Sequence, residues 1–357
     1  MIFVLPPILL ILIVLNIKIK KPTECFENPL RVETTTSINA VFVLIIFFSH
    51  MTQYISLNYY DKLLYSIPMM FTQLVVVSFL FFSGYGIMES INKKGYDYVK
   101  TFPQKRLLKV WFDFAFALVL FIVVQLILGN FKNFSVEQVL LAFTGWTSIG
   151  NSSWYMFAIF TFYIVLYLSF ILLYKKSRLA SLCLVTILSV VYVVVLNIVL
   201  KGTKTYYYDT FLCLPAGMWF SCYKEYFYTF VKKWYMYLLV LGLSIALFIL
   251  LFYTKNIYAF NFASIMFALI LVLLSMKISI SNVVLNWIGK HTFWIYILQR
   301  IPMIIFKHIG LANVNNYLFM AASLVVTILL SWGVKIAVDK LKVLIFDRKS
   351  QKKVQTV

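Results

Sequence analysis

The chain of 357 residues is 62% hydrophobic and 18% aromatic, and only 12% of its residues are charged. A soluble domain keeps about a quarter of its residues charged, so this composition excludes a soluble globular protein. The net charge of +20 does not indicate nucleic-acid binding, because the cations lie in short segments between apolar runs rather than in one basic domain. Cytoplasmic loops of membrane proteins collect Lys and Arg in this way.

Apolar runs of about 17–25 residues, long enough to cross ~30 Å of hydrocarbon as helices, recur along the chain. They predict an all-α fold, a polytopic transmembrane helix bundle. The first run contains Pro6 and Pro7, and its cations Lys18, Lys20 and Lys21 follow it, so we interpret it as an uncleaved span rather than a signal peptide. The eleven predicted spans are Ile2–Ile17, Ser37–Leu57, Ile67–Ile91, Leu107–Leu128, Ser152–Tyr174, Leu179–Leu200, Thr210–Phe227, Trp234–Tyr253, Tyr258–Met276, Val283–Phe306 and Tyr317–Val338.

The distribution of cations predicts the orientation of these spans. If the linker Lys18–Thr36 is cytoplasmic, most of the 32 Lys and Arg residues fall on the inside, as the positive-inside rule requires. The chain is then a multi-pass protein of the plasma membrane with its N-terminus outside and its C-terminus inside. Residues 339–357 form a basic cytoplasmic tail near the inner leaflet. The outside loops hold only Lys62, Lys132, Lys201, Lys204, Lys255 and Lys307.

Two common kinds of site have no motif in this chain. Cys25, Cys183, Cys213 and Cys222 form no CxxC pair and have no histidine at metal-ligand spacing, so we expect neither disulfides nor a metal site. The sequence contains no glycine-rich phosphate loop and no soluble catalytic domain. Any chemistry must therefore take place within the bundle or at its two mouths.

His50 is an ionisable side chain inside the apolar segment INAVFVLIIFFSHMTQYI, which predicts that it lies deep within its span. Such a side chain should face the protein interior or a water-filled cavity. Imidazole transfers protons near neutral pH, although a structural hydrogen bond between helices would also explain it. Asn39 precedes His50 by eleven residues, which places both on one helix face, about 16 Å apart along the axis. We expect Asn39 at the cytoplasmic mouth of this stripe, or else as a helix cap.

The segment FPQKRLLKVWFDF places Lys105, Arg106 and Lys109 at the cytoplasmic end of a span. These cations either anchor the helix at the inner surface or capture a phosphorylated cytosolic ligand. Asp113 lies one turn beyond Lys109, so we expect the two to form an ion pair along the helix.

The polar segment Gly145–Trp154 precedes a span that starts on the outside. It either dips back into the membrane or lines the outer mouth. Trp154 and Tyr155 could stack on a sugar ring, although interfacial aromatic residues are common in membrane proteins. Asp209 lies on the same side.

Two other spans carry residues of interest. In FLFFSGYGIMES, Ser83 and Gly84 are small residues of the kind that let helices approach closely. IGKHTFWIYILQRIP places His291 near the inner surface and Gln299 and Arg300 within a span. An arginine at that depth requires a partner or a wet cavity.

In order and spacing, these motifs resemble membrane-bound acyltransferase family 3, the polytopic O-acyltransferases that modify surface polysaccharides. The branch that O-acetylates capsular polysaccharide is the most similar. The resemblance runs from Ser37 to Val338 and includes KRLLKVW for the basic R-x-x-R motif, SSWYMFAIFTFY for the Trp-led helix, FLCLPAGMWF for the small-residue helix and IGKHTFWIYILQRIP for the penultimate helix. His50 matches the first-helix histidine, and the FF-x-SGY segment is matched through Ser83, Gly84 and Tyr85.

The resemblance implies a ten-helix acyltransferase core over residues 37–338, preceded by an extra N-terminal transmembrane helix and cytoplasmic linker over residues 1–36. Three positions depart from the family pattern. Asn39 stands where the family usually has Arg or Lys, and Lys109 takes a position where arginine would contact phosphate bidentately. Gln299 and Arg300 end the penultimate helix where many members carry His. A catalytically inactive relative would also show Asn39.

The resemblance also implies the reaction: transfer of acetyl from cytosolic acetyl-CoA, used as a substrate with no permanently bound cofactor, to a glycan hydroxyl. Lys105, Arg106 and Lys109 would hold the nucleotide, and the pantetheine arm would extend along the stripe from Asn39. His50 would act as the general base or as the acyl-carrying nucleophile. The candidates for binding the substrate or the oxyanion are Ser83, Tyr85, Trp154, Tyr155 and Arg300.

The implied partners are membrane lipid, acetyl-CoA, a glycan acceptor and polysaccharide-assembly proteins, with no nucleic acid. Two other classes remain open. A flippase or polymerase of lipid-linked sugars shares the basic, aromatic, many-span character but has no need of a histidine within a span. A membrane glycosyltransferase needs outer-face carboxylates, and Asp61, Glu137 and Asp209 form no pair.

Overall fold

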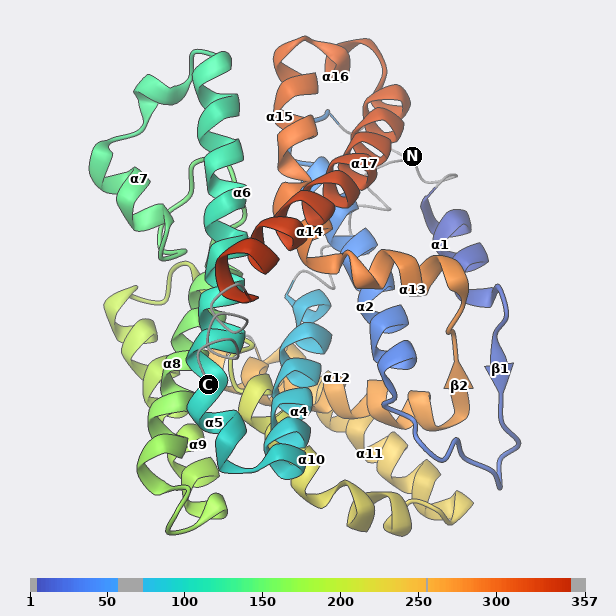
Figure 1. Cartoon of the computed structure of the whole chain (residues 1–357). Coiled ribbons are helices and arrows are strands. Elements are labelled where there is room, and N and C mark those ends of the chain that lie inside the picture. Colours follow the sequence, from blue (N-terminus) through green and yellow to red (C-terminus); the bar gives the residue numbers. More distant parts are fainter. Residues whose placement is uncertain (1–4, 57–72, 255, 348–357) are drawn as a thin grey trace.

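A computed structural model describes residues 5–56, 73–254 and 256–347, and most of these residues are helical (Figure 1). Loops and a ladder of two short antiparallel strands make up the rest. The helices are α1 Leu5–Val14, α2 Val32–Met51, η1 Leu74–Val76, α4 Val77–Lys94, α5 Tyr96–Phe102, η2 Pro103–Leu107, α6 Leu108–Ile127, η3 Phe131–Asn133, α7 Val136–Ala142, α8 Trp154–Leu173, α9 Arg178–Val199, η4 Thr205–Tyr207, α10 Cys213–Phe230, α11 Trp234–Tyr253, α12 Ile257–Lys277, α13 Val283–Lys290, α14 Thr292–Leu298, α15 Arg300–His308, α16 Leu311–Val314, α17 Asn316–Lys342 and η5 Val343–Asp347; the strands are β1 Lys18–Ile19 and β2 Ile278–Ser279.

Among the described residues, 8 helical stretches are long and apolar enough to cross a membrane. The predicted fold class, an all-α polytopic bundle, is therefore confirmed. The predicted span Ile67–Ile91 begins outside the described residues, and its described part begins at Leu74. The stretches are Val32–Met51, Leu74–Lys94, Tyr96–Ile127, Trp154–Leu173, Arg178–Val199, Trp234–Tyr253, Ile257–Lys277 and Asn316–Phe346.

The N-terminal segment differs from the predicted span Ile2–Ile17. Its described helix, α1, has 10 residues, which gives about 15 Å of length at 1.5 Å per residue, half of a bilayer core. The following chain pairs β1 with β2. The ammonium of Lys277 donates to the carbonyl of Pro22 over 2.7 Å and so fastens the linker to the end of α12.

The predicted span Val283–Phe306 is divided into α13, α14 and α15. In Figure 1, α13 runs across the picture while α15 runs up it. Gly289 lets α13 pack directly on the backbone of Thr36 in α2. The second break follows Leu298, and Pro302 explains it: proline has no N–H to donate to the carbonyl four residues earlier, and its ring collides with that carbonyl.

Close packing of α4 on α10 forms part of the bundle core. A Cβ atom on Gly84 would collide with the carbonyl of Leu214, and one on Gly217 with the carbonyl of Phe81. The two glycines therefore permit backbone approach from both sides of the interface. This confirms the structural interpretation of the small-residue motifs.

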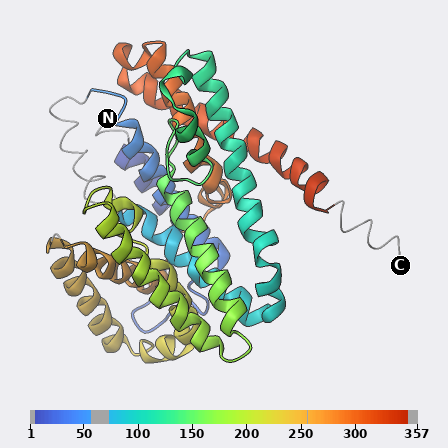
Figure 2. The same cartoon turned by 90° about the vertical axis from the view of Figure 1, so that its left-hand side faces the viewer.

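The last long helix, α17, continues past the predicted boundary at Val338 as far as Lys342, and η5 follows it. Figure 2 shows this end of the chain leaving the bundle. Lys342 forms an ion pair with Asp113 of α6, whereas Lys109 lies 5.9 Å from the ring centre of Phe346. The predicted pair between Lys109 and Asp113 was therefore wrong, because a tertiary partner takes the carboxylate. The predicted tail from 348 onward lies outside the described residues.

Candidate active site

His50 lies in the last turn of α2, because this helix begins at Val32 and ends at Met51. The prediction that it lies deep within a span ending at Leu57 is corrected accordingly. The backbone leaves the helix directly after Thr52, whose hydroxyl donates to the carbonyl of Ser49 over 2.7 Å. The imidazole therefore stands where α2 opens into a cavity.

Gln299 positions the imidazole of His50 from the break between α14 and α15. Its amide nitrogen Nε2 lies 3.0 Å from Nδ1 of His50 and donates over 2.9 Å to the carbonyl of Tyr296. With the amide in this orientation, its nitrogen only donates, so Nδ1 of His50 accepts and a neutral ring has its proton on Nε2. Oε1 of Gln299 is buried without a hydrogen-bond partner among the described residues.

Arg300, the next residue, is surrounded by neutral oxygen atoms. Its guanidinium donates from Nε to Oγ of Ser152 over 2.9 Å, from Nη2 to Oε1 of Gln53 over 2.9 Å and from Nη1 to the hydroxyl of Tyr54 over 3.3 Å. None of the ion pairs found among the described residues includes this arginine. We predicted that an arginine at this position needs a partner or a wet cavity. Arg300 has polar partners and also lines a cavity.

The His50 cavity, as we call the space beside this histidine, has a volume of about 640 Å³. Two loops close it: the segment before α8, predicted to line a mouth of the bundle, and the segment between α9 and α10. Its wall contains aromatic rings, amides, hydroxyls and two cations. The lining residues are Ile45, Ile46, Ser49, His50, Gln53, Gln73, Val75, Val76, Gln138, Trp146, Thr147, Ser148, Asn151, Ser152, Ser153, Trp154, Lys204, Tyr206, Tyr207, Tyr296 and Arg300.

A smaller cavity of about 230 Å³ lies next to it, and we call it the Asn39 cavity. Ile46, Val76 and Tyr296 line both cavities. Asn39, Ile46 and His50 are spaced by seven and four residues on α2, so one face of this helix runs past both spaces, as the eleven-residue spacing predicted. The other residues lining the smaller cavity are Phe79, Ser83, Tyr155, Thr292 and Phe293.

The Asn39 cavity contains polar atoms that the described part of the chain leaves without partners. Oδ1 of Asn39 and Oγ1 of Thr292 are both buried and unpaired there. Buried polar atoms are normally hydrogen-bonded. A ligand with amide or hydroxyl groups in this space would supply the missing partners.

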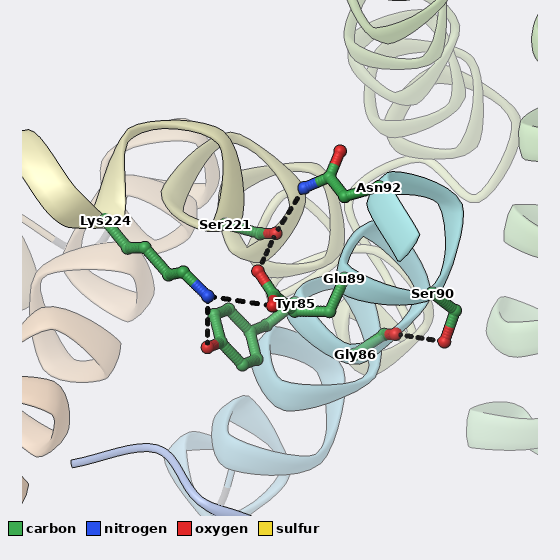
Figure 3. A network of polar contacts seen from close by, with 7 residues as sticks. All are labelled: Tyr85, Gly86, Glu89, Ser90, Asn92, Ser221 and Lys224. Carbon is green, nitrogen blue, oxygen red and sulfur yellow. Dashed lines mark hydrogen bonds and ion pairs between the residues drawn. The ribbon is translucent and has the colours of Figure 1, made fainter. Parts of the chain in front are cut away.

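Ser83 and Tyr155 meet in the Asn39 cavity, where the serine hydroxyl approaches the phenol. Tyr85 points elsewhere, because side chains two residues apart on a helix are rotated by about 200°. Its hydroxyl accepts from Lys224 over 3.5 Å, in a network between α4 and α10 (Figure 3). Lys224 pairs there with Glu89 over 2.8 Å. The structure therefore separates Tyr85 from the other predicted site residues.

The three basic positions at the start of α6 do not act as one cluster. Arg106 donates to the hydroxyl of Tyr98 over 3.3 Å and interacts electrostatically with Tyr163. Tyr163 lies eight residues after Tyr155 on α8, about 12 Å along the helix, so Arg106 stands beyond the end of the Asn39 cavity. Lys105 is exposed, and Lys109 lies beside Phe346.

The two described acids on the His50 side, Glu137 and Asp209, do not form a catalytic pair at the cavity. Glu137 is exposed, Asp209 is 4% exposed, and neither lines the His50 cavity. Burial raises the pKa of the Asp209 carboxyl well above its ordinary value. Asp61 lies outside the described residues. His291 is also removed from the site, since its Nδ1 lies 2.8 Å from the carbonyl of Trp287.

From the sequence we did not identify Tyr296, Thr292 and Lys204 as residues that line the cavities. We named Gln299 but did not predict its contact with His50. One signal was present. Thr292, Tyr296 and Gln299 repeat at intervals of four and three residues, which places them on one helical face. No comparable pattern indicates Lys204, because it lies in a loop.

Comparison with known proteins adds one finding to this geometry. A family model described as an acyltransferase domain matches residues 37–336. No curated protein and no solved structure matches the chain. The matched segment includes all the described residues that line the two cavities.

Proposed function

The chain belongs to the membrane-bound acyltransferase family 3, and we propose that it transfers an acetyl group from acetyl-CoA to a hydroxyl of a cell-surface polysaccharide or of its lipid-linked precursor. The family match makes it an integral membrane acyltransferase. The choice of acetyl and of a glycan acceptor follows the resemblance to capsular O-acetyltransferases and is part of the proposal.

The observation that carries the proposal is the pair of adjacent cavities along α2. The His50 cavity is wide and lined with aromatic and hydrogen-bonding groups, which suits a sugar. The Asn39 cavity is narrow and largely apolar with unpaired polar atoms, which suits the pantetheine arm with its amide groups. His50 stands beside the wall residues that both cavities share.

On the donor side, Arg106 and Lys105 would bind the phosphates of CoA from the cytoplasm. Arg106 interacts with Tyr163, which lies about 12 Å along α8 from Tyr155, and the arm would cover this distance toward Asn39. Arginine suits this role because it binds phosphate bidentately. Asn39 then acts as a hydrogen-bonding residue along the arm, which removes the need for a cation at that position.

On the acceptor side, His50 would remove the proton from the attacking hydroxyl. The oxygen bonds to the thioester carbonyl carbon, the carbon–sulfur bond breaks, and the proton passes from His50 to the departing thiolate. In the resting arrangement Nε2 of His50 carries the proton. Half a turn of the Gln299 amide would present Oε1 to Nδ1 of His50. When the ring then loses its proton from Nε2 to solvent and gains one at Nδ1, Nδ1–H donates to Oε1 and the lone pair of Nε2 is free for this step.

The test measures ester-linked acetyl in the surface polysaccharide of the native host by NMR. We expect deletion of the gene to remove the acetyl signal. Rescue with the wild-type chain should restore it, and rescue with His50→Ala should not. A matched control is His308→Ala, which alters an exposed histidine at the end of α15.

Two outcomes would contradict the proposal. Full restoration by His50→Ala would exclude this histidine as the base. Unchanged acetyl with a shortened or missing polymer would indicate a flippase or polymerase instead. The presence of the His50→Ala chain in the membrane, checked by immunoblot, separates loss of chemistry from loss of protein.

A further inference from the structure

Among the described residues, those that line the His50 cavity carry positive charge and no negative charge. Arg300 and Lys204 both line it, and no Asp or Glu is among the described lining residues. The nearest acid along the chain from Lys204 is Asp209, which is buried and does not reach the cavity. The outside loops of this protein contain few cations, so the position of Lys204 at this mouth is informative.

Arg300 retains binding capacity for an anion. A guanidinium has five N–H donors, and within the described chain three of them donate to the neutral oxygens of Gln53, Tyr54 and Ser152. These contacts fix the orientation of the group without neutralising it. The remaining donors and the full positive charge are available to a ligand.

Asn151 supplies a further donor in the same wall. It is 4% exposed, and its Oδ1 accepts from the backbone N–H of Ile149 over 3.1 Å. Its Nδ2 is buried and unpaired among the residues that the structure describes. A buried N–H group without an acceptor favours a ligand that brings acceptor oxygens.

Lys204 is held in an unfavourable backbone conformation, with a φ of 47°. Side chains other than Gly, Asn and Asp rarely adopt this left-handed region. The turn nevertheless places a lysine at the cavity, where a glycine or asparagine would be less strained. Lys201 in the same loop shares this conformation, so what sets Lys204 apart is that its side chain lines the cavity.

We propose that the acceptor carries an anionic group, a carboxylate or a phosphate, which Arg300 and Lys204 bind while its hydroxyl faces His50. This inference rests on the proposed function, because it specifies the class of acceptor. The anion has two possible sources: an acidic sugar in the glycan itself, or the pyrophosphate of a polyprenyl-linked precursor. Oxygen atoms of either would meet the donors of Arg300 and Asn151.

The test compares two probes on the full chain in nanodiscs of zwitterionic lipid. One probe is a glucuronate-containing tetrasaccharide, and the other is the same tetrasaccharide with its carboxylates reduced to alcohols. Calorimetry should show that the acidic probe binds at least about tenfold more tightly. Arg300→Gln and Lys204→Gln should each remove about tenfold of the acidic probe's affinity and leave the reduced probe unchanged.

Lys201→Gln is the matched control. Lys201 lies in the same loop with a φ of 50° and does not line the His50 cavity, so its loss should not change the affinity for either probe. Equal affinity for the two probes would exclude an acidic sugar as the source of the anion. Equal losses from Lys201→Gln and Lys204→Gln would overturn the inference.

A third probe, a polyprenyl pyrophosphate carrying a neutral disaccharide, distinguishes the sources. Binding of this probe through Arg300 and Lys204 assigns the anion to the lipid carrier, and binding of the glucuronate probe assigns it to the sugar. The inference is overturned if neither binds.

Transfer of labelled acetyl from acetyl-CoA, measured in the same discs, separates this inference from the proposed function. Transfer to the acidic, the reduced and the pyrophosphate probe at equal efficiency keeps the enzyme function and removes the inference. If the probes bind in a charge-dependent way but no bound probe receives acetyl, the anion site stands and the proposed enzyme function is removed.

Discussion

Two polar regions of the bundle differ in whether their charges are paired. Between α4 and α10, Lys224 binds Glu89, whose other oxygen accepts from Ser221 over 2.7 Å (Figure 3). At the His50 cavity, Arg300 binds only neutral oxygens, and Oε1 of Gln299 has no partner among the described residues. The first region connects two helices, whereas the second leaves charge and hydrogen-bonding capacity for a ligand. A charge without a charged partner at a cavity wall, rather than polarity itself, distinguishes the candidate site from the α4–α10 contact.

Breaking the α4–α10 contact should have the largest effect. Gly217→Val places a side chain against the backbone of Phe81, where there is no space, so we expect loss of folded protein. Size-exclusion chromatography in detergent measures this directly. Gly242→Val is the control, since a Cβ atom at Gly242 meets nothing within 4 Å, and a monodisperse Gly217→Val protein would contradict the role of this contact.

Changing Gln299 tests the other region without removing the histidine. Gln299→Leu should lower acyl transfer by about 100-fold, because neither ring nitrogen of His50 is then held for proton transfer. Gln299→Glu should retain most of the activity, since a carboxylate accepts from Nδ1–H and leaves Nε2 as the base. ¹⁵N NMR of labelled histidine reports the tautomer in each variant, and full activity in the leucine variant would exclude this positioning role.

Removing one charge of the paired region should affect stability more than activity. Glu89→Gln leaves Lys224 without its carboxylate, and the partial exposure of both side chains limits the expected cost to about 1 kcal/mol. Acyl transfer should stay within about twofold, because the pair does not line either cavity. Thermal unfolding in detergent gives the stability, and Glu89→Gln combined with Lys224→Met should recover part of it. A large loss of transfer with normal stability would place Glu89 in the reaction.

The smallest expected effect concerns Asp209, the buried acid nearest to the His50 cavity along the chain. Burial raises its pKa, so the folded state favours the neutral carboxyl, and the stability that this group contributes is lost as the pH rises from about 4 through the raised pKa. Asp209→Asn removes this dependence. Between pH 4.5 and 8, the melting temperature of the wild type should therefore fall relative to that of the variant. Parallel curves would show that Asp209 is ionised in the fold.

Much of the fold was predictable because the bilayer imposes simple rules. Helices must satisfy their own backbone in lipid, so apolar runs such as Trp234–Tyr253 gave correct bounds. The stripe from Asn39 to His50 was also predictable, since it depends only on helical geometry. The division at Pro302 was missed, because a proline in an apolar run does not by itself show whether a helix continues.

By itself the sequence determined that the chain lies in a bilayer, that it is helical and which family it resembles. It also placed Asn39 and His50 on one helix face. Each of these depends on composition or on local spacing. Only the tertiary structure decided which polar residues meet. It paired Asp113 with Lys342 rather than Lys109, directed Tyr85 to Lys224, and brought Gln299 to His50 across 249 positions of sequence. Contacts of this range depend on helix packing and on breaks in helices, which local sequence patterns do not encode.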